Sequence, residues 1–317
     1  MIAQRVRAFA PASIGNLGVG FDLLGLAISG AGDTVTAERV ESPGVVIADI
    51  TGDSIGCDAS QLSRITGKNT AGIAAEALWQ AHGGSAGLQL TLHKGTPLGS
   101  GMGSSAASAV AGAIAANALL PSPLTEHDVL EFAMLGEAFA SKARHADNVA
   151  PSLLGGLVLC PVARLPELTP LPVPEGLCSV LVHPHLRVNT SDARSVLRDD
   201  VALSTSVAQM GLLANFIHAC HTSNASLMSE SLKDLIVEPQ RSVLVDGFAS
   251  VQAAALAAGA LGSSLSGSGP SLFALCAEPE AQRVADAMQS AFREAGTHSD
   301  VWVSPMNAAG ATVEVLA

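Results

Sequence analysis

The sequence predicts an α+β fold in two domains. Three observations support this prediction. The N-terminal half places a strand directly before a glycine loop and an alanine-rich helix, the C-terminal half alternates strands and helices, and a proline-rich stretch separates the halves. That stretch, residues 161–175 (PVARLPELTPLPVPE), is typical of a linker. We therefore expect an N-terminal domain over residues 1–160 and a C-terminal domain over residues 161–317.

The composition is that of a folded protein without a nucleic-acid surface. Of the 317 residues, 48% are hydrophobic and 14% are charged, which favours a large buried core. The formal net charge of −12 argues against nucleic-acid binding, because that needs a basic surface. The five cysteines are scattered, the first residues lack a signal peptide, and no apolar run spans a bilayer comfortably. We expect a cytoplasmic protein with no membrane partner.

The first strand leads into a glycine-rich loop. Residues 4–10 (QRVRAFA) alternate as a strand does, and we expect Pro11 to end that strand. The loop that follows carries Asn16 and Asp22 between glycines. Both side chains suit hydrogen bonds to a small polar substrate. They equally suit local turns, in which Asn and Asp bond their own backbone.

The central part of the N-terminal half is expected to form strands around one helix. Residues 70–82 should be helical, with Asn69 as the cap. Three stretches read as strands: residues 33–40, 45–51 and 87–94. The last of these ends in His93 and Lys94, which we interpret as solvated residues at the strand end.

The most distinctive stretch is residues 97–109 (PLGSGMGSSAASA). Gly99, Gly101 and Gly103 alternate with small residues, and the alanine-rich run after Ser105 predicts a helix. The first N–H groups of a helix have no partner within it and lie at its positive end. A glycine loop opening onto such an end is typical of phosphate binding, although a flexible linker or a tight turn has a similar composition. The stretch lacks the lysine of the usual P-loop and contains no GxSxG.

A second helix is expected over residues 125–143. Thr125 caps it, and Asp128 lies three residues on, as in a near capping box. Glu137 lies off the apolar stripe of this helix, and a glutamate in such a place is usually solvated.

The segment that follows, residues 145–156 (HADNVAPSLLGG), gathers three polar side chains at the start of a strand. They are His145, Asp147 and Asn148. Groups of this kind need partners when they lie near a buried strand. They therefore form either a polar turn that satisfies itself or a set of donors and acceptors facing the glycine loop.

The C-terminal half is expected to alternate strands and helices. The expected strands are residues 178–183, 271–276, 300–303 and 311–315, and the expected helices are residues 202–220, 224–232, 247–260 and 281–296. Gly267 lies in a third glycine-rich turn, within residues 261–276. Arg194 follows Thr190 or Ser191 on a short helix, and Arg241 follows a Glu-Pro turn. Lone arginines are usually surface residues, but a guanidinium fork also binds a carboxylate.

Three segments in this order resemble the GHMP kinase superfamily. They are PASIGNLGVGFD at residues 11–22, PLGSGMGSSAAS at residues 97–108 and LSGSGPSLFAL at residues 265–275. The segments HADNVAPSLLGG and TSDARSVL resemble the homoserine kinase branch in particular, and the resemblance runs almost end to end. Val19 and Met102 depart from the common pattern but carry no functional side chain. The resemblance implies an S5-like N-terminal domain, a C-terminal α/β sandwich domain and a homodimer.

The resemblance also implies ATP and Mg²⁺ as cofactors and L-homoserine as substrate. The nucleotide phosphates would lie against Pro97, Leu98, Gly99, Ser100, Gly101, Met102, Gly103, Ser104, Ser105, Ala106 and Ala107, with Asn69 near the adenine. Ser105 and Glu137 would hold Mg²⁺, a hard cation that prefers oxygen ligands.

L-Homoserine would lie among a set of polar residues: Asn16, Asp22, His145, Asp147, Asn148, Arg194, Arg241 and Gly267. Asp22 suits its ammonium group, and Arg194 and Arg241 suit its carboxylate. Asp147 is either a general base or a residue that orients the hydroxyl with Asn148. These two residues and Arg194 are the expected catalytic group.

Other functions remain open at this point. A mevalonate-type or shikimate-type kinase needs different groups at Arg194 and Arg241. A catalytically silent metabolite-binding relative needs a broken phosphate or metal site, whereas Ser105, Glu137 and the loop glycines are all present. A Rossmann oxidoreductase fits poorly, because no acidic ribose ligand follows the glycine loop at the expected spacing.

Overall fold

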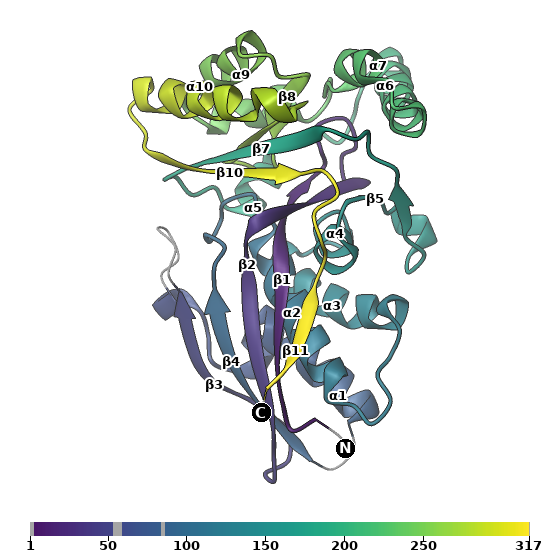
Figure 1. Ribbon diagram of the computed structural model, residues 1–317, viewed down its shortest axis with the longest axis vertical. Helices are drawn as coiled ribbons and strands as arrows, with labels where there is room; N and C mark the ends of the chain where they lie inside the picture. The colour runs from purple at the N-terminus through teal and green to yellow at the C-terminus, as the bar shows by residue number, and fades with distance from the viewer. Residues whose placement is uncertain (1–2, 53–58, 84–85, 317) are drawn as a thin grey trace.

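Two β-sheets and their helices form the α+β fold that the sequence predicts (Figure 1). The structure is a computed structural model that describes residues 3–52, 59–83 and 86–316. The larger sheet lies below and the smaller one above in the view of Figure 1, and the chain crosses between them near their junction. In the described chain, no helix is both long and apolar enough to cross a membrane.

The larger sheet has the strand order β11-β1-β2-β4-β3, with β5 and β6 attached beside β2. Its strands are β1 (Arg5–Gly15), β2 (Leu24–Val40), β3 (Val45–Gly52), β4 (Gly87–Lys94), β5 (Leu157–Leu159), β6 (Thr169–Leu171) and β11 (Thr312–Val315). Only β3 and β4 pair in parallel; the other described pairs in this sheet are antiparallel.

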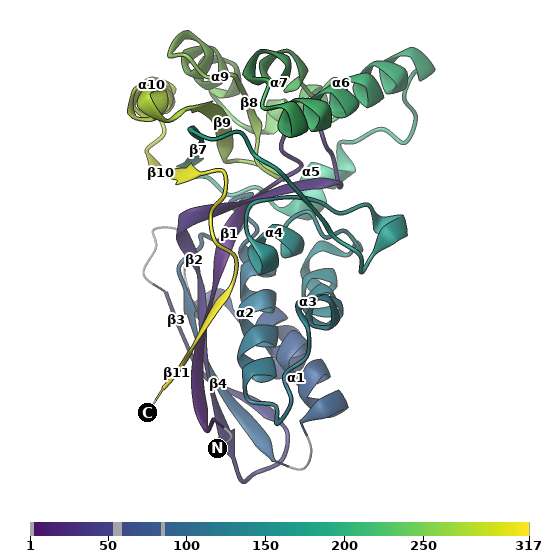
Figure 2. The same cartoon turned by 45° about the vertical axis from the view of Figure 1, so that its right-hand side comes forward.

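Four helices cover one face of this sheet (Figure 2). They are α1 (Thr70–His82), α2 (Ser104–Ala118), α3 (Glu126–Ser141) and α4 (Val149–Leu154). The small residues of α2 let its neighbours approach closely. A methyl group on Gly112 would come within 2.4 Å of the carbonyl oxygen of Ala71 in α1. The alanine-rich sequence therefore places α2 at the centre of the layer, with its first turn at the junction of the sheets.

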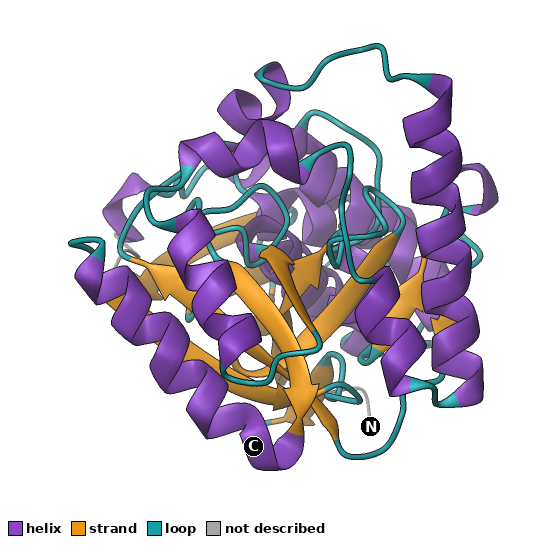
Figure 3. Ribbon diagram, turned by 90° about the horizontal axis from the view of Figure 1, so that it is seen from above, coloured by secondary structure: helices purple, strands orange, loops and turns teal. Residues whose placement is uncertain are grey.

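The smaller sheet has the order β10-β7-β9-β8 and is antiparallel throughout. Its strands are β7 (Leu177–Pro184), β8 (Gly262–Leu265), β9 (Leu272–Ala277) and β10 (Ser299–Pro305). The helices of this half are α5 (Thr190–Ser195), α6 (Leu203–Thr222), α7 (Ala225–Ser231), α8 (Glu238–Arg241), α9 (Phe248–Ala257) and α10 (Ala281–Glu294). Seen from above, helices form an outer layer in front of the strands (Figure 3).

Three local expectations were wrong. Pro11 does not end the first strand, because the pairing with β2 shifts register between Pro11 and Ser13. At such a bulge a residue without an N–H is tolerated. Residues 149–154 form a helix, and residues 262–265 form a strand, where no such elements were expected.

Strands from the second half of the sequence complete the larger sheet. β6 pairs with β5, and β11 pairs with β1, so both lie in the first sheet although they follow residue 160. The expected linker, residues 161–175, therefore contains a strand of that sheet. Strands of the larger sheet therefore occur on both sides of residue 160. The division into domains at residues 160 and 161 stays a prediction.

Candidate active site

The three glycine-rich segments meet at the junction of the sheets. The amide of Ser13, from the first segment, donates to the carbonyl of Met102 at 3.0 Å. The amide and hydroxyl of Ser271, from the third, donate to the carbonyl of Ser100 at 3.2 and 2.6 Å. Stretches far apart in sequence thus hold the backbone of the central loop on two sides.

The loop needs glycine at its turns. Gly101 and Gly103 have φ angles of 76° and 65°, in the left-handed region. A methyl group on Gly101 would lie 2.4 Å from the carbonyl oxygen of Ser266, and one on Gly103 would lie 2.2 Å from Oγ of Ser13. Larger residues would therefore force the three segments apart.

The side chain of Lys94 contacts the first turn of α2. The structure contradicts our interpretation of it as a solvated residue, because its side chain is only 2% exposed. Its ammonium group pairs with Asp33 and donates to the carbonyl of Ser104 at 2.9 Å and to Oγ of Ser108 at 2.8 Å. Asp33 also accepts the hydroxyl of Ser108 at 2.6 Å.

A sequence signal for this burial was available. Alternation in β4 puts Lys94 on the face that also carries three buried leucines, namely Leu88, Leu90 and Leu92. A lysine on the buried face needs a carboxylate partner.

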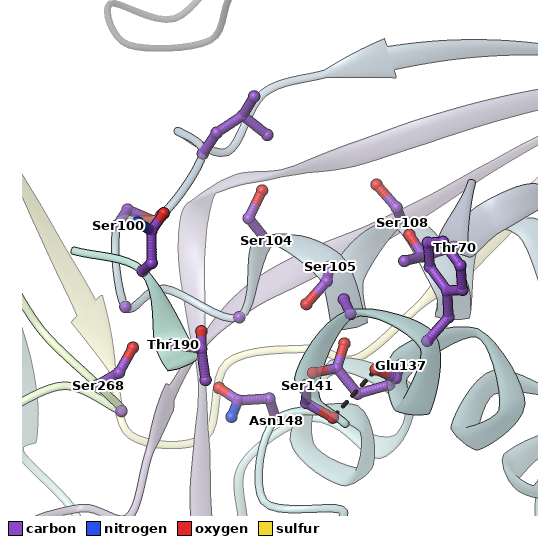
Figure 4. A pocket seen from close by; sticks show the side chains of 18 of the residues that line it. Thr70, Ser100, Ser104, Ser105, Ser108, Glu137, Ser141, Asn148, Thr190 and Ser268 are labelled. Atoms are coloured by element: carbon purple, nitrogen blue, oxygen red, sulfur yellow. Dashed lines mark hydrogen bonds between the residues drawn. The ribbon is translucent and has the colours of Figure 1, made fainter. Parts of the chain in front are cut away.

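Glu137 and Ser105 come together at the start of α2 (Figure 4). Glu137 is 6% exposed, and its Oε2 is a buried atom without a hydrogen-bond partner among the described residues. Burial raises the pKa of Glu137 to about 7, although hydrogen bonding from Ser105 and the charge of His145 oppose this. The expectation that a glutamate off the apolar stripe is solvated was wrong here.

His145, Asp147 and Asn148 form a connected chain of polar groups. Nδ1 of His145 lies 2.6 Å from Oδ1 of Asp147, and the amide of Asn148 donates to Oδ2 of Asp147 at 3.2 Å. The hydroxyl of Ser13 donates to Oδ1 of Asn148 at 2.9 Å, which fixes the orientation of that amide. Burial lowers the pKa of His145, but its hydrogen bond to Asp147 and the charge of that residue outweigh burial and raise it to about 8.

Arg194 and Arg241 gather around the ring of Phe21. The guanidinium carbons lie 5.7 and 5.3 Å from the centre of the Phe21 ring. Nη2 of Arg194 contacts both carboxylate oxygens of Asp22 at 3.2 Å. Arg241 is 3% exposed, and burial, with the charge of Arg194, lowers its pKa. Two cations held together in this way suit an anionic ligand.

The side chains of Arg241 and Asn16 hold the backbone of the third glycine segment. Nη1 of Arg241 donates to the carbonyl of Gly267 at 3.1 Å, and the amide of Asn16 donates to the same oxygen at 2.9 Å. Oδ1 of Asn16 also accepts the N–H of Asp22 at 3.0 Å. Asn16 therefore does not close an Asx turn; its side chain joins the N–H of Asp22, six residues on, to the third glycine segment, and it lies in the cavity wall.

One cavity of about 390 Å³ joins these groups. It is lined by most of the residues singled out from the sequence: Asn16, Asp22, Asn69, Leu98, Gly99, Ser100, Gly101, Gly103, Ser104, Ser105, Glu137, His145, Asp147, Asn148, Arg194, Arg241 and Gly267. Asn69 also caps α1, as expected, by accepting the N–H groups of Ala71 and Gly72. Pro97, Met102, Ala106 and Ala107 do not line the cavity.

The chain is similar to known proteins over nearly its whole length. The GHMP kinases N terminal domain model matches residues 69–156, and the GHMP kinases C terminal model matches residues 212–294. A homoserine kinase of Xanthomonas campestris is 45% identical over 309 residues, which cover 97% of this chain and 94% of that protein. The chain belongs to the homoserine kinase family of the GHMP kinases. A homoserine kinase of Xylella fastidiosa is 44% identical over 98% of this chain and 94% of its own length.

Solved structures of GHMP kinases share this fold. The crystal structure of homoserine kinase from Cytophaga hutchinsonii has a TM-score of 0.92 and 42% identity, covering 99% of this chain and 98% of that one. The mevalonate kinase of L. major has a TM-score of 0.68 over 95% of this chain and 96% of its own, at 15% identity, which shows the fold alone.

Within this homoserine kinase fold, the Glu137 and Ser105 pair fits a magnesium ion. A carboxylate and a hydroxyl are hard oxygen donors, which Mg²⁺ prefers. The unpartnered Oε2 of Glu137 is a buried acceptor that a cation would satisfy. A second group also has ligand atoms close together, since those of Asp22, His145 and Asp147 lie within 4.8 Å of one another. We assign no metal to that group, because Arg194 already pairs with Asp22 and His145 with Asp147.

Sequence reasoning missed other cavity residues, notably Lys68, Arg187 and Thr190. Lys68 comes directly before the cap of α1, so its place beside the expected adenine site was readable from the sequence. Arg187 lies between β7 and α5 and reaches the glycine loop only through the tertiary fold. No pattern in the sequence signals that approach.

Proposed function

We propose that the protein transfers the γ-phosphoryl group of ATP to the side-chain hydroxyl of L-homoserine. The products are ADP and O-phospho-L-homoserine, and the reaction serves threonine biosynthesis. The observation that carries the proposal is a single cavity lined both by the glycine loop and by two arginines beside an aspartate. This pairing suits a phosphoryl donor and an amino-acid acceptor held together.

The arginine side of the cavity suits the backbone groups of an amino acid. A carboxylate would lie between Arg194 and Arg241, since a guanidinium binds two oxygens through parallel N–H groups. Asp22 would bind the ammonium group. Arg194 contacts Asp22 in this structure. The substrate would come between them, with its carboxylate facing Arg194 and its ammonium group facing Asp22. No charge would then be left buried and unpaired.

Asp147 and Asn148 would hold the hydroxyl that attacks. Asp147 has hydrogen bonds to His145 and Asn148, and its remaining lone pairs are free to accept the hydroxyl proton in a hydrogen bond. The transition state of phosphoryl transfer is loose, so positioning and charge neutralisation matter more than a strong base. We therefore infer that Asp147 orients the hydroxyl and that protonated His145 compensates its charge.

The nucleotide phosphates would lie on the glycine loop and the first turn of α2. The unpaired backbone N–H groups at the positive end of a helix bind anions. Ser105 and Glu137 would hold Mg²⁺, which supplies charge neutralisation on the phosphate oxygens. Asn69 and Lys68, at the start of α1, would border the adenine.

A coupled ADP-release assay tests the proposal. Homoserine, mevalonate, shikimate and galactose are each offered with MgATP, and the product is identified by phosphorus NMR. We expect turnover with homoserine alone. Turnover with another alcohol and none with homoserine would overturn the proposal and would point to a different GHMP kinase.

We place the reaction in the cytoplasm, where ATP is available. Cys160, Cys178, Cys220 and Cys276 are free thiols, which suit a reducing compartment. Fractionation of cells that carry a tagged chain tests this placement, and recovery in the periplasmic fraction would contradict it.

We also propose a homodimer formed through α6. This helix has no Asp, Glu, Lys or Arg in its 20 residues and extends outward from the upper part of the molecule (Figure 2). Leu203, Val207 and Met210, spaced to lie on one helix face, are 78%, 55% and 60% exposed. A second copy fits this face, because two uncharged surfaces bury no unpaired charge, whereas other parts of two chains with a net charge of −12 repel each other.

Light scattering after gel filtration measures the oligomeric state. Met210→Asp should convert the dimer to a monomer. Val243→Asp, at an apolar residue that is 76% exposed and lies outside α6, is the control and should leave the dimer intact. A monomeric wild-type protein would overturn this assignment.

A further inference from the structure

Five lysine and arginine side chains line the cavity, and they differ in their partners. They are Lys68, Lys94, Arg187, Arg194 and Arg241. Lys94 is paired with Asp33, and Arg194 with Asp22. Arg241 is tied to the carbonyl of Gly267, on the amino-acid side of the cavity. Two cations then remain on the side of the glycine loop and α1, and one of them, Arg187, contacts the loop directly.

Arg187 lies against the first glycine of the loop. Gly99 has a φ of 62°, and a methyl group there would come within 2.5 Å of Cγ and 3.0 Å of Nε of Arg187. The N–H of Val188 donates to the carbonyl of Gly99 at 3.1 Å. The side chain of Arg187 and the backbone of Val188 therefore both contact the loop. These contacts hold the guanidinium of Arg187 beside the loop.

The guanidinium of Arg187 is held by a neutral group. Its Nη1 donates to Oε1 of Gln61, which also lines the cavity, at 2.6 Å. Gln61 ends the short 3₁₀ helix Ala59–Gln61. A guanidinium has five N–H donors in a planar fork that matches phosphate oxygens, and an amide oxygen leaves its charge uncompensated. A guanidinium whose charge is not compensated can bind an anion such as a phosphate group.

We propose that Arg187 is a nucleotide-binding residue that donates its guanidinium fork to the polyphosphate of ATP and ADP. The inference rests on the proposed function, because it needs the nucleotide phosphates on the glycine loop. A triphosphate stays anionic even with one Mg²⁺ bound, and the chain itself is acidic, with a net charge of −12. A local cation offsets the repulsion that this overall charge creates. The cation comes from the C-terminal half of the sequence, so nucleotide binding joins the two halves.

A purely structural role would give a different result. If Arg187 only ties its segment to Gln61, then removing Gln61 should have the same effect as removing the arginine. The two roles can be separated by measuring binding without turnover. Isothermal titration with ATP, ADP and adenosine, in the presence of Mg²⁺ and without homoserine, is the readout.

The variants are Arg187→Gln, Gln61→Ala and, as a control, Arg198→Gln, an exposed arginine on the other side of α5 whose backbone N–H bonds Gln240. We expect Arg187→Gln to weaken ATP and ADP binding about tenfold or more while adenosine binding is unchanged. Gln61→Ala and Arg198→Gln should bind ATP as the wild type does. Unchanged adenosine binding also shows that the variant is folded.

Two results would overturn the inference. Wild-type affinity of Arg187→Gln for ATP would remove the phosphate contact, and an equal loss in Gln61→Ala would leave only the structural tie. Failure of the wild-type protein itself to bind ATP would instead overturn the proposed function, so the two failures are distinguishable. The salt dependence adds a check, because losing a phosphate contact should reduce the slope of log affinity against log salt for Arg187→Gln.

Discussion

Replacing Glu137 with glutamine should make the protein more stable and nearly inactive. The buried carboxylate is unfavourable when charged, because burial raises its pKa from 4.5 to about 7. A neutral amide of the same shape removes that cost. It also removes the charged oxygen that we assign to Mg²⁺, so we expect kcat to fall at least about 10²-fold.

The size of the stability gain follows from the two pKa values. Each pKa unit between the folded and unfolded states corresponds to 1.36 kcal/mol. A folded pKa of about 7 against an unfolded value of 4.5 amounts to about 3 kcal/mol. The sign follows from the raised folded pKa. The contribution of protonated Glu137 to stability is fully present below pH 4.5 and is lost as the pH rises to about 7. The free energy of unfolding of Glu137→Gln, relative to that of the wild type, should therefore increase between pH 4.5 and about 7. The difference should persist at higher pH.

Urea unfolding at several pH values, with EDTA present, measures this effect. Glu131→Gln is the control, since Glu131 is on the same helix but pairs with Arg144 in a largely exposed contact. Its stability should track the wild type across the pH range. A Glu137→Gln variant that is no more stable than the wild type at pH 8 would refute the reasoning about burial.

Magnesium gives a second test of the same residue. Mg²⁺ binds the ionised carboxylate, so added Mg²⁺ should stabilise the wild type by mass action at pH 8 and should not stabilise Glu137→Gln. Equal stabilisation of both proteins would refute the metal assignment without touching the pKa argument.

Three further predictions concern other groups of the site. Arg194→Leu should raise KM for homoserine about tenfold or more while KM for ATP changes little, and equal effects in steady-state kinetics would contradict the carboxylate assignment. Lys94→Met should lower the free energy of unfolding by about 3 kcal/mol or more, because Asp33 stays buried without its cation; a urea midpoint close to that of the wild type would count against this. Activity should decline as the pH rises above about 8, where His145 loses its proton, and His145→Gln should abolish that limb of the pH–kcat/KM profile; an unchanged limb would show that another group titrates.

The regular elements were predictable because their patterns are local. The expected helix at residues 70–82 and the expected strand at residues 87–94 have the bounds of α1 and β4. Asn69 caps α1 and Thr125 caps α3, as their residue types indicate. Each of these features depends on neighbours within a few residues, and a single sequence contains that information.

Long-range partners were not predictable in the same way. Nothing near Lys94 in the sequence shows that Asp33, 61 residues away, lies against it. The position of Glu137 off the apolar stripe of α3 predicts a solvated side chain, because the sequence does not show what covers the other side of this helix. The family resemblance implies a ligand role for Glu137 and makes no statement about Lys94. The partners that satisfy a buried polar residue depend on the assembled layers, and only the fold reveals them.

The pairing of β1 with β11 has a consequence for biosynthesis. Of the described strands, β1 (Arg5–Gly15) is synthesised first and its outer neighbour β11 (Thr312–Val315) is synthesised last. A nascent chain therefore carries β1 with one unsatisfied edge until β11 has been made, and such edges recruit other chains. Contacts between the two extremes of a sequence also slow folding, because a long loop must close before they form. We expect this edge to be where incomplete chains associate wrongly and where a chaperone is most useful.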